Sequence, residues 1–144
     1  MVYLEKLDVH NWLKVCELSV SDEQKEIFSI PNVYWIGISR YEEHTELFAI
    51  KSDDDYVGLI GCGYDEDGIA GYINPLMIDQ AYQGNGYAGK AMEQAIDYLK
   101  KELKVSVIHL GHRKNNIAAS KLYDSCGFVV IDEDDLDYFR ELKL

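Results

Sequence analysis

A glycine-rich segment constrains this chain more than any other feature of its sequence. The segment follows an apolar run that ends at Ile78, precedes a helical pattern that continues to Leu99, and reads Gln83, Gly84, Asn85, Gly86, Tyr87, Ala88, Gly89 and Lys90. Glycine lets the backbone adopt positive φ and approach a ligand closely. A helix that begins directly after such a loop points unpaired N–H groups and the positive end of its dipole at that ligand. We therefore predict a loop that binds phosphate.

Two common phosphate-binding motifs fit the glycine spacing but fail elsewhere. Gly84 to Lys90 has the spacing of a P-loop, but Ala91 stands where a serine or threonine hydroxyl would hold Mg²⁺. The dinucleotide pattern G-x-G-x-x-G is also present, yet polar residues separate it from the preceding strand. The next strand, at residues 105–110, is followed by no carboxylate for a ribose. Neither motif therefore assigns the cofactor.

A third motif begins at Gln83, and a second match supports it downstream. Gln83-x-x-Gly86-x-Ala88 fits the pattern (Arg/Gln)-x-x-Gly-x-(Gly/Ala), and the later segment reads Asn116-x-x-Ala119-x-x-Leu122-Tyr123-x-x-x-Gly127-Phe128. In residue types and separation, the pair resembles the two cofactor motifs of the GNAT family of N-acetyltransferases, which cradle the pyrophosphate of acetyl-coenzyme A (acetyl-CoA). One such motif alone is weak, but two at the right separation are a strong signal.

Length and composition bound the class of protein. The 144 residues fit one domain, residues 1–144, that buries a core without help from metal or disulfides. Hydrophobic residues make up 47% of the chain, and no apolar run reaches the length of a membrane span. The first residues carry neither a basic segment nor a long apolar one, so no secretory signal is visible and we expect a cytoplasmic location. The three widely spaced cysteines are typical of reduced thiols.

The net charge of −12 argues against nucleic acid and anionic membranes as partners. Acidic residues gather at positions 53–55, 65–67 and 132–135. Solvated turns explain each cluster as well as a binding role does. The charge as a whole nevertheless favours a cationic partner, and a small amine substrate fits.

Hydrophobic periodicity predicts an α/β fold. We expect strands at residues 2–7, 46–50, 56–64, 71–78, 105–110, 128–131 and 136–142. We expect helices at residues 11–18, from residue 21 to just before Pro31, and at 88–99 and 116–125, whereas residues 32–43 fit either a helix or a strand. The order β-α-α-β-β-β-α-β-α-β-β resembles the GNAT fold, a mixed, mostly antiparallel sheet flanked by helices.

The resemblance implies where acetyl-CoA lies. In that family the strand before the phosphate loop splays from its neighbour, and the pantetheine arm pairs with the exposed backbone like an added strand. The cofactor-binding residues implied are Leu76, Met77 and Ile78 for the arm, residues 83–89 for the pyrophosphate, and Asn116 and Ala119 for the far wall of the notch.

The resemblance also implies one catalytic residue. Acetyl transfer to an amine needs a neutral nitrogen, a stabilised oxyanion and a proton for the departing thiolate. Tyr123 matches the family tyrosine that protonates the sulfur of CoA, and a phenol suits this role because it is neutral and donates a hydrogen bond. The oxyanion partner implied is a backbone N–H near Met77 or Ile78. The alternative for Tyr123 is a core tyrosine on an amphipathic helix.

The general base is not identified. Residues 11–24 and 77–84 resemble the bacterial spermidine/spermine (diamine) N-acetyltransferase branch, whose members commonly carry an acidic residue shortly before the phosphate loop. Asn74 and Pro75 occupy that neighbourhood here, and neither accepts a proton. Either a water chain to a distant carboxylate serves, or the substrate differs. The residues expected on the acceptor side are Asn74, Glu42 and Glu43, with Glu46 as a further candidate base.

Two further pairs of residues invite a ligand. His109 and His112 have metal-like spacing, but no third ligand is nearby and we expect no metal. Arg113 and Lys114 either meet CoA phosphates or lie in solvent.

The function that these observations predict is an acetyl-CoA-dependent N-acetyltransferase acting on a small cationic amine, with polyamines such as spermidine and spermine first. The alternatives are another amine, such as an aminoglycoside or an amino-acid derivative, and an acyl-CoA-binding regulator without turnover. The family's frequent homodimerisation is left open for this chain.

Overall fold

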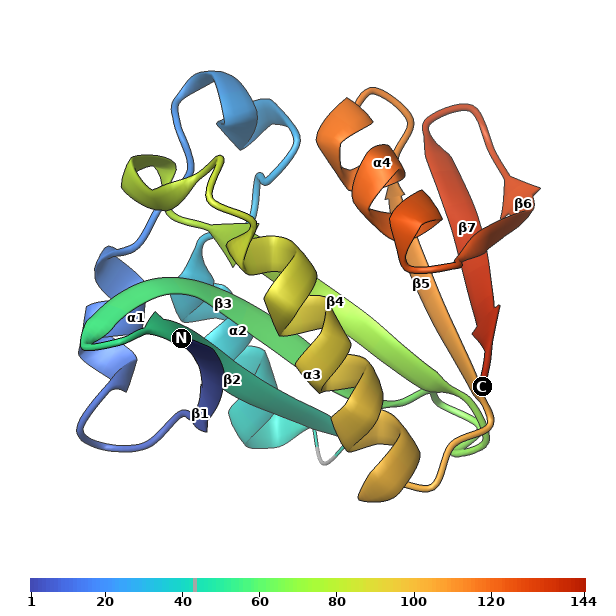
Figure 1. The fold of residues 1–144 in the computed structure, drawn as a ribbon, viewed down its shortest axis with the longest axis horizontal. Helices are drawn as coiled ribbons and strands as arrows, with labels where there is room; N and C mark the ends of the chain where they lie inside the picture. Colours follow the sequence, from blue (N-terminus) through green and yellow to red (C-terminus); the bar gives the residue numbers. More distant parts are fainter. Residues whose placement is uncertain (43) are drawn as a thin grey trace.

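A seven-stranded sheet forms the centre of the molecule (Figure 1), which a computed structural model describes at every residue except 43. The strands are β1 (Val2–Lys6), β2 (Thr45–Ser52), β3 (Asp55–Tyr64), β4 (Gly71–Ile78), β5 (Val107–Arg113), β6 (Val129–Glu133) and β7 (Asp137–Lys143). The α-helices are α1 (Trp12–Glu17), α2 (Asn32–Tyr41), α3 (Tyr87–Lys101) and α4 (Ile117–Ser125). The sheet order is β1-β2-β3-β4-β5-β7-β6, and only the β4–β5 pair is parallel among the pairs described. The predicted mixed, mostly antiparallel α/β fold is confirmed.

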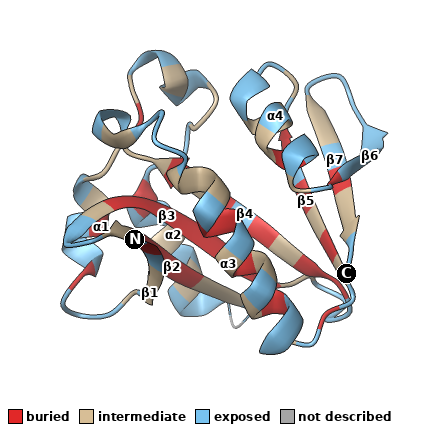
Figure 2. Cartoon of the chain, in the orientation of Figure 1, coloured by how far each residue is buried: buried red, intermediate tan, exposed pale blue. Residues whose placement is uncertain are grey.

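Helices cover the sheet on both faces, and the buried residues concentrate along the central strands (Figure 2). α3 buries one stripe of apolar side chains, whose members are Ala91, Met92, Ala95 and Leu99. Tyr123 of α4 and Phe128 belong to the same core. A second core lies on the opposite face beneath α1 and α2, and its buried members are Val15, Val20, Leu47, Ala49, Leu59 and Met77. No helix in the described part of the chain combines the length and apolar character needed to cross a membrane.

The segment between α1 and β2 differs from the expectation. Ser21 and Gln24 form the predicted capping box, with Ser21 N–H donating to Gln24 Oε1 (3.2 Å) and Gln24 N–H donating to Ser21 Oγ (3.3 Å). This box starts only a short 3₁₀ helix, Glu23–Glu26, so the predicted α-helix from residue 21 to Pro31 is wrong. Pro31 disfavours a helical backbone at the preceding residue, Ile30, so a helix that starts at Ser21 does not continue into residues 32–41.

Residues 32–41, for which the sequence left helix and strand open, form α2. Pro31 precedes this helix in an extended conformation. The buried side-chain amide of Asn32 donates to the carbonyls of Val15 (2.9 Å) and Leu18 (3.2 Å). These bonds occupy carbonyls at the end of α1, and they fix α2 against it.

β4 and β5 pair only where they begin. The register joins Gly71 to Ile108 and Tyr72 to His109, and the two strands share no further pair. Beyond Tyr72 the strands diverge, and the ribbon of β4 separates from that of β5 towards α4 (Figure 1). β5 also lies further along the chain than predicted, at Val107–Arg113 instead of residues 105–110.

Candidate active site

A bulge in β4 lies where the two strands diverge. Ile60 pairs with Leu76 and Cys62 pairs with Ile73, so β4 holds one residue more than β3 between these pairs. Asn74 and Pro75 are the residues that share this position. Such a bulge reverses the alternation of side chains along the strand and bends it. β4 therefore turns away from β5 directly after its first residues.

The ladder beyond the bulge determines which backbone groups face the notch between β4 and β5. Asp79 N–H donates to the Val57 carbonyl (2.8 Å), and hydrogen-bonded pairs recur at every second residue of an antiparallel ladder. The Met77–Leu59 pair is therefore also hydrogen-bonded, and the N–H and C=O of Met77 point to β3. The backbone groups of Leu76 and Ile78 point the other way, to the side of the notch, where the Ile78 carbonyl accepts from Gln83 Nε2 (2.9 Å).

The glycine-rich loop leads into α3 with the geometry of an anion site. Gly84 (φ +82°) and Gly86 (φ +77°) lie in the left-handed region, which disfavours any residue with a Cβ. Gly86 is the N-cap of α3 and supplies no side-chain cap. Lys90 N–H makes the first bond of the helix, to the Gly86 carbonyl (3.3 Å). The N–H groups of Tyr87, Ala88 and Gly89 are thus the unpaired donors of the first turn.

Side chains brace this loop from two directions. Asn85 Nδ2 donates to the Tyr82 carbonyl (2.9 Å), so this side chain holds the loop itself. Gln83 Nε2 donates to the Ile78 carbonyl (2.9 Å), and the amides of Gln83 and Gln24 exchange hydrogen bonds of 2.9 and 3.0 Å. In the sequence, Gln24 indicated only the start of a helix. Nothing in the sequence indicated that its side chain also holds the glycine-rich loop.

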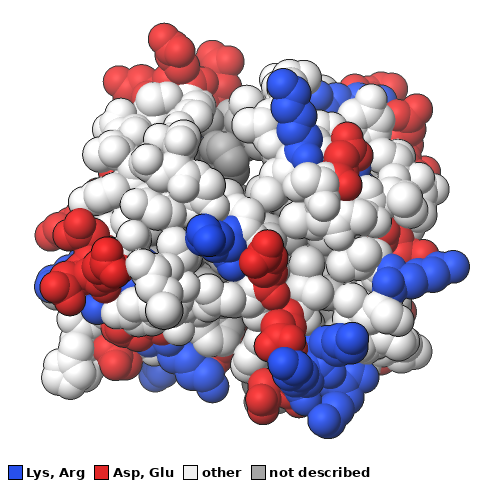
Figure 3. Space-filling view, in the orientation of Figure 1, with Lys and Arg blue, Asp and Glu red and all other residues white. Residues whose placement is uncertain are grey.

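Asn116 and Ala119 form the start of α4. Asn116 Oδ1 accepts a hydrogen bond from Ala119 N–H (3.1 Å), so the first residue of the second motif is the helix cap. Figure 3 shows a hollow beside α4, above the start of α3 in this view. The surface around this hollow is mostly uncharged, and acidic side chains gather at the edges of the view.

Tyr123 of α4 is buried, with 7% of the residue exposed. Its ring contacts His112 (ring centroids 5.3 Å apart) and Phe128 (6.0 Å). The hydroxyl makes no hydrogen bond to any described residue, yet no fully buried side-chain N or O atom in the described chain lacks a partner. The hydroxyl therefore reaches the protein surface. Burial raises the pKa of Tyr123 to about 12, so the phenol stays protonated at neutral pH.

A buried arginine lies behind Tyr123 and joins α4 to the sheet. Arg140 of β7 is 3% exposed, and its guanidinium donates to Asp124 Oδ1 (2.6 Å) and Ser120 Oγ (2.9 Å) of α4. It also donates to the Phe128 carbonyl (3.1 Å) and, through Nε, to His112 Nε2 (2.9 Å). Because His112 Nε2 accepts, Nδ1 carries the proton and donates to the Arg113 carbonyl (3.0 Å). Burial lowers the pKa of His112, which favours this neutral form.

A pocket of about 500 Å³ opens where β4 and β5 diverge. Its polar and aromatic lining residues include Tyr72, Asn74, His109, Asp132 and Phe139. On β5, the side chain of Leu110 packs in the core beneath α3, and on β7, the side chain of Arg140 bonds to α4. His109 directly precedes Leu110, and Phe139 directly precedes Arg140. Since successive side chains of a strand point to opposite faces, the side chains of His109 and Phe139 lie on the face opposite α4. The sequence had placed Asn74 on the acceptor side, but it gave no indication that His109, Asp132 and Phe139 lie beside it.

The other predicted residues lie outside this pocket or in ion pairs. Glu42 is the exposed C-cap of α2, and Glu43 lies outside the described residues. Glu46 forms an ion pair with Lys6 (3.0 Å). Arg113 pairs with Asp137 (3.6 Å) and Lys114 with Glu133 (3.2 Å). Within the described chain, no group of three or more histidine, cysteine, aspartate or glutamate side chains is arranged to hold a metal ion.

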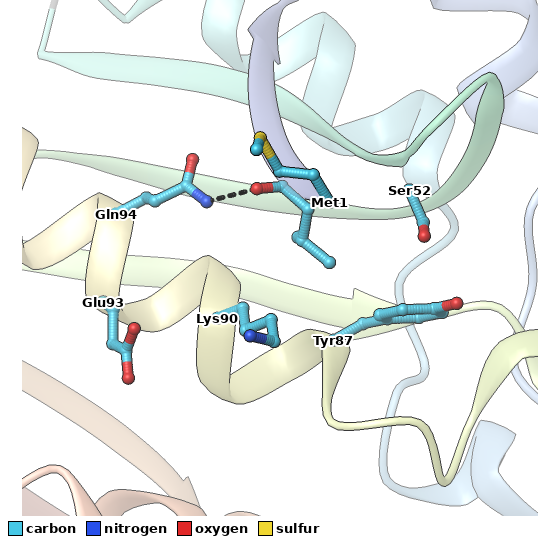
Figure 4. A pocket seen from close by; sticks show the side chains of 7 residues that line it. Met1, Ser52, Tyr87, Lys90, Glu93 and Gln94 are labelled. Atoms are coloured by element: carbon cyan, nitrogen blue, oxygen red, sulfur yellow. Dashed lines mark hydrogen bonds between the residues drawn. The ribbon is translucent and has the colours of Figure 1, made fainter.

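A smaller hollow of about 330 Å³ lies between β1 and α3 (Figure 4). Tyr87, Lys90, Glu93 and Gln94 of α3 line it, and Gln94 Nε2 donates to the Val2 carbonyl (2.7 Å). Gln94 Oε1 accepts from Leu4 N–H (3.1 Å), so these bonds hold the edge strand β1 to α3. The hollow lies on the β1 side of α3, away from the notch.

The structure combines a parallel strand pair that splits after two residue pairs, a helix start with unpaired N–H groups, and a protonated phenol on α4. The sequence matches the Acetyltransferase (GNAT) family over residues 7–128. This match covers most of the chain, and the chain belongs to that family.

Individual relatives divide between several acceptors. Spermine/spermidine N(1)-acetyltransferase of Bacillus subtilis is 35% identical over 82 residues, which are 53% of this chain and 54% of that enzyme. The alignment thus spans about half the length of this relative. N-alpha-acetyltransferase 30 of Schizosaccharomyces pombe is 28% identical over 123 residues, 83% of this chain and 79% of that protein.

Solved structures share the fold across the chain. Spermidine N-acetyltransferase from Vibrio cholerae, in complex with CoA and spermine, superposes with a TM-score of 0.79 at 17% identity, and the comparison covers 99% of this chain and 95% of that one. At this identity the likeness establishes the fold alone.

Proposed function

We propose that this protein transfers the acetyl group of acetyl-CoA to a primary amine of a small cationic acceptor, with polyamines such as spermidine and spermine first. The observation that carries the proposal is the pairing of β4 with β5, which stops after Tyr72 and His109. It leaves the N–H and C=O of Leu76 and the N–H of Ile78 open to the notch, beside an unpaired helix start, while the Ile78 carbonyl is held by Gln83.

The residues present fit acetyl-CoA. When bound, acetyl-CoA supplies an activated acetyl group and a thiol leaving group. The N–H groups at the start of α3 are suited to the pyrophosphate because they are unpaired donors at the positive end of a helix dipole. The N–H and C=O of Leu76 are suited to the amide groups of the pantetheine arm, as in the addition of a strand to a sheet edge. Asn116 and Ala119, at the start of α4, remain the proposed far wall.

Two groups of this chain are assigned to the chemistry. The N–H of Ile78 faces the notch, and it is the donor we assign to the oxyanion of the reacting acetyl group. Tyr123 is assigned as the proton donor to the departing sulfur, because its hydroxyl is protonated, reaches the surface and has no described protein partner.

The acceptor is proposed to enter from the opposite face of the sheet, through the pocket at Tyr72, Asn74 and His109. Asp132 lines this pocket, and the chain carries a net charge of −12. Both favour an acceptor with several ammonium groups, whose approach is steered by the negative field. The relative from Bacillus subtilis supports polyamines as the class to test first.

A second candidate acceptor is the N-terminal amine of a peptide. The relative from Schizosaccharomyces pombe, an N-alpha-acetyltransferase, aligns over more of the chain than the polyamine enzyme does. Aminoglycosides and amino-acid derivatives remain further acceptors. A cytoplasmic location and a homodimer stay predictions.

A screen of amines with acetyl-CoA, read by thiol release, tests the proposal. Polyamines, aminoglycosides, amino-acid derivatives and short peptides form the library. We expect release with spermidine or spermine above the rate with acetyl-CoA alone. Release with peptides alone would move the acceptor class to protein N-termini. Binding of CoA without release for any amine would favour an acyl-CoA-binding regulator.

A further inference from the structure

The acceptor pocket is lined by a histidine that is paired with a carboxylate of the neighbouring strand β7, and this pair has no role assigned so far. His109 Nε2 lies 2.8 Å from Glu141 Oε2. The two side chains are 40% and 22% exposed, and His109 is the member of the pair that lines the pocket. We propose that His109, oriented by Glu141, is the general base that takes the proton from the acceptor amine, a role that rests on the proposed acetyl transfer.

The position of His109 in the sheet supports this role. His109 pairs with Tyr72, and these residues form the last pair before β4 and β5 separate. Its side chain shares the pocket with Asn74, which lies just beyond the separation on β4. An amine that enters the pocket towards the notch therefore passes His109. Asn74 cannot serve as base, because a neutral amide does not accept a proton at physiological pH.

Glu141 determines which nitrogen of His109 is available. A carboxylate only accepts hydrogen bonds, so Nε2 of a neutral His109 carries the hydrogen that Glu141 receives. Nδ1 then presents its lone pair and makes no hydrogen bond to a described residue. This is the arrangement by which a carboxylate orients a catalytic imidazole and stabilises its protonated form. Glu141 is accordingly a positioning residue.

The other groups that face His109 support a cationic guest. Asp132 on β6 lines the same pocket and adds a second carboxylate. Tyr72 on β4 is hydrogen-bonded to Thr45 through its hydroxyl, and burial raises its pKa, so it is neutral there. Arg140 lines the pocket by position, but its guanidinium is bound to α4 and His112 on the other face. Among the lining residues, the charged group left to face a guest is thus the carboxylate of Asp132, with Glu141 beyond His109.

The protons balance in this assignment. The acceptor arrives as an ammonium ion, and one proton passes to His109 Nδ1, which leaves a neutral amine as the nucleophile. The new N–C bond forms first, while the carbonyl oxygen takes up negative charge at the Ile78 N–H, and the C–S bond then breaks. Tyr123 gives its proton to the departing sulfur, and the second proton of the acceptor nitrogen passes through solvent to Tyr123 and restores its hydroxyl. His109 releases its proton to solvent, so one proton is released for each acetyl group transferred.

The test is the pH dependence of His109→Gln, with His10→Gln as the matched control because His10 is an exposed residue in the turn before α1. A general base contributes about 10²- to 10⁴-fold when the amine must be deprotonated. We expect kcat/KM of His109→Gln for spermidine to fall at least about 10²-fold at pH 7. The deficit should shrink towards pH 10, where free amines lose their protons without assistance. Glu141→Gln should show a smaller deficit with the same pH trend.

A spectroscopic arm keeps the inference distinct from the proposed function. Imidazole NMR signals of the wild-type protein are followed while spermidine is added in the presence of CoA. We expect the His109 signal to report the Nε2-protonated tautomer and to shift with spermidine, while the His10 signal stays unchanged. If the wild type acetylates no amine, the proposed function fails, and the His109 titration still decides whether the amine meets this residue. A His109 signal unmoved by spermidine, or a His109→Gln variant whose kcat/KM stays within about twofold of wild type at pH 7, would overturn the inference.

Discussion

Replacing Tyr123 with phenylalanine separates its chemical role from its structural one. The ring of Tyr123 packs against His112 and Phe128, and phenylalanine keeps those contacts. The hydroxyl bonds to no described residue and reaches the surface, so its loss breaks no internal hydrogen bond. We therefore expect the free energy of unfolding of Tyr123→Phe to stay within about 0.5 kcal/mol of wild type.

The expected kinetic effect is much larger. Loss of a general acid costs on the order of 10²-fold or more in kcat, which corresponds to about 2.7 kcal/mol of activation free energy. Because the pKa of Tyr123 is raised to about 12, the wild-type hydroxyl stays protonated between pH 6 and 10. The ratio of wild-type to variant kcat should therefore be nearly constant over that range.

The assay is thiol release at saturating acetyl-CoA and amine, combined with urea unfolding of each protein. Tyr138→Phe is the matched control, because the Tyr138 ring on β7 also contacts His112 (ring centroids 5.7 Å apart) and this substitution likewise removes one phenolic hydroxyl. It should leave kcat nearly unchanged. Tyr123→Phe with wild-type kcat would show that Tyr123 is only a core residue. A loss of more than about 2 kcal/mol in stability would show that the hydroxyl has an internal partner.

Three further predictions concern the cofactor loop and the buried cluster. Gly86→Ala should weaken CoA binding, measured by calorimetry, and lower the free energy of unfolding by about 1–2 kcal/mol because φ is +77°. The control is Gly68→Ala, in a turn with φ +69°, which should cost similar stability and leave CoA affinity unchanged. Arg140→Met should lower the free energy of unfolding by about 2–6 kcal/mol, because His112 Nε2 and the Phe128 carbonyl become buried acceptors without donors, each at a cost of about 1–3 kcal/mol. A change under about 1 kcal/mol in urea unfolding would contradict this. Since the pKa of His112 is lowered from 6.5, the stability that neutral His112 contributes should be present above pH 6.5 and be lost as the pH falls below it. The fall in Tm from pH 7 to pH 5 should therefore be smaller in His112→Asn than in wild type.

Local patterns explain what could be predicted from the sequence. The glycine-rich loop depends on Gly84 and Gly86 and on a helix start within the same segment, so one stretch of chain contains the whole signal. The sequences of β2, β3 and β4 alternate or run apolar over their own length, so these strands can be predicted without their partners. The fold class followed from these signals, although the second α-helix forms at Asn32–Tyr41 and not before Pro31.

The remaining features depend on contacts between distant segments. Gln24 and Gln83 exchange hydrogen bonds across the fold, and the capping pattern at Gln24 gave no sign of this contact. Arg140 reaches α4 and His112 only because β7 inserts between β5 and β6. His109 meets Glu141 through the same insertion, so the search for a base near Asn74 in the sequence did not find it. The capping box at Ser21 predicted a helix start correctly but not that the helix would end after one turn.

The central claim is that this chain acetylates an amine with acetyl-CoA bound in the notch between β4 and β5. The most direct measurement is mass spectrometry of spermidine after incubation with acetyl-CoA and the full chain, together with a count of the thiol released. We predict spermidine carrying one added acetyl group, in amounts equal to the thiol, and strong loss of product with Tyr123→Phe. Unmodified spermidine and unmodified members of the amine library at every pH from 6 to 10, with CoA bound, would contradict the claim.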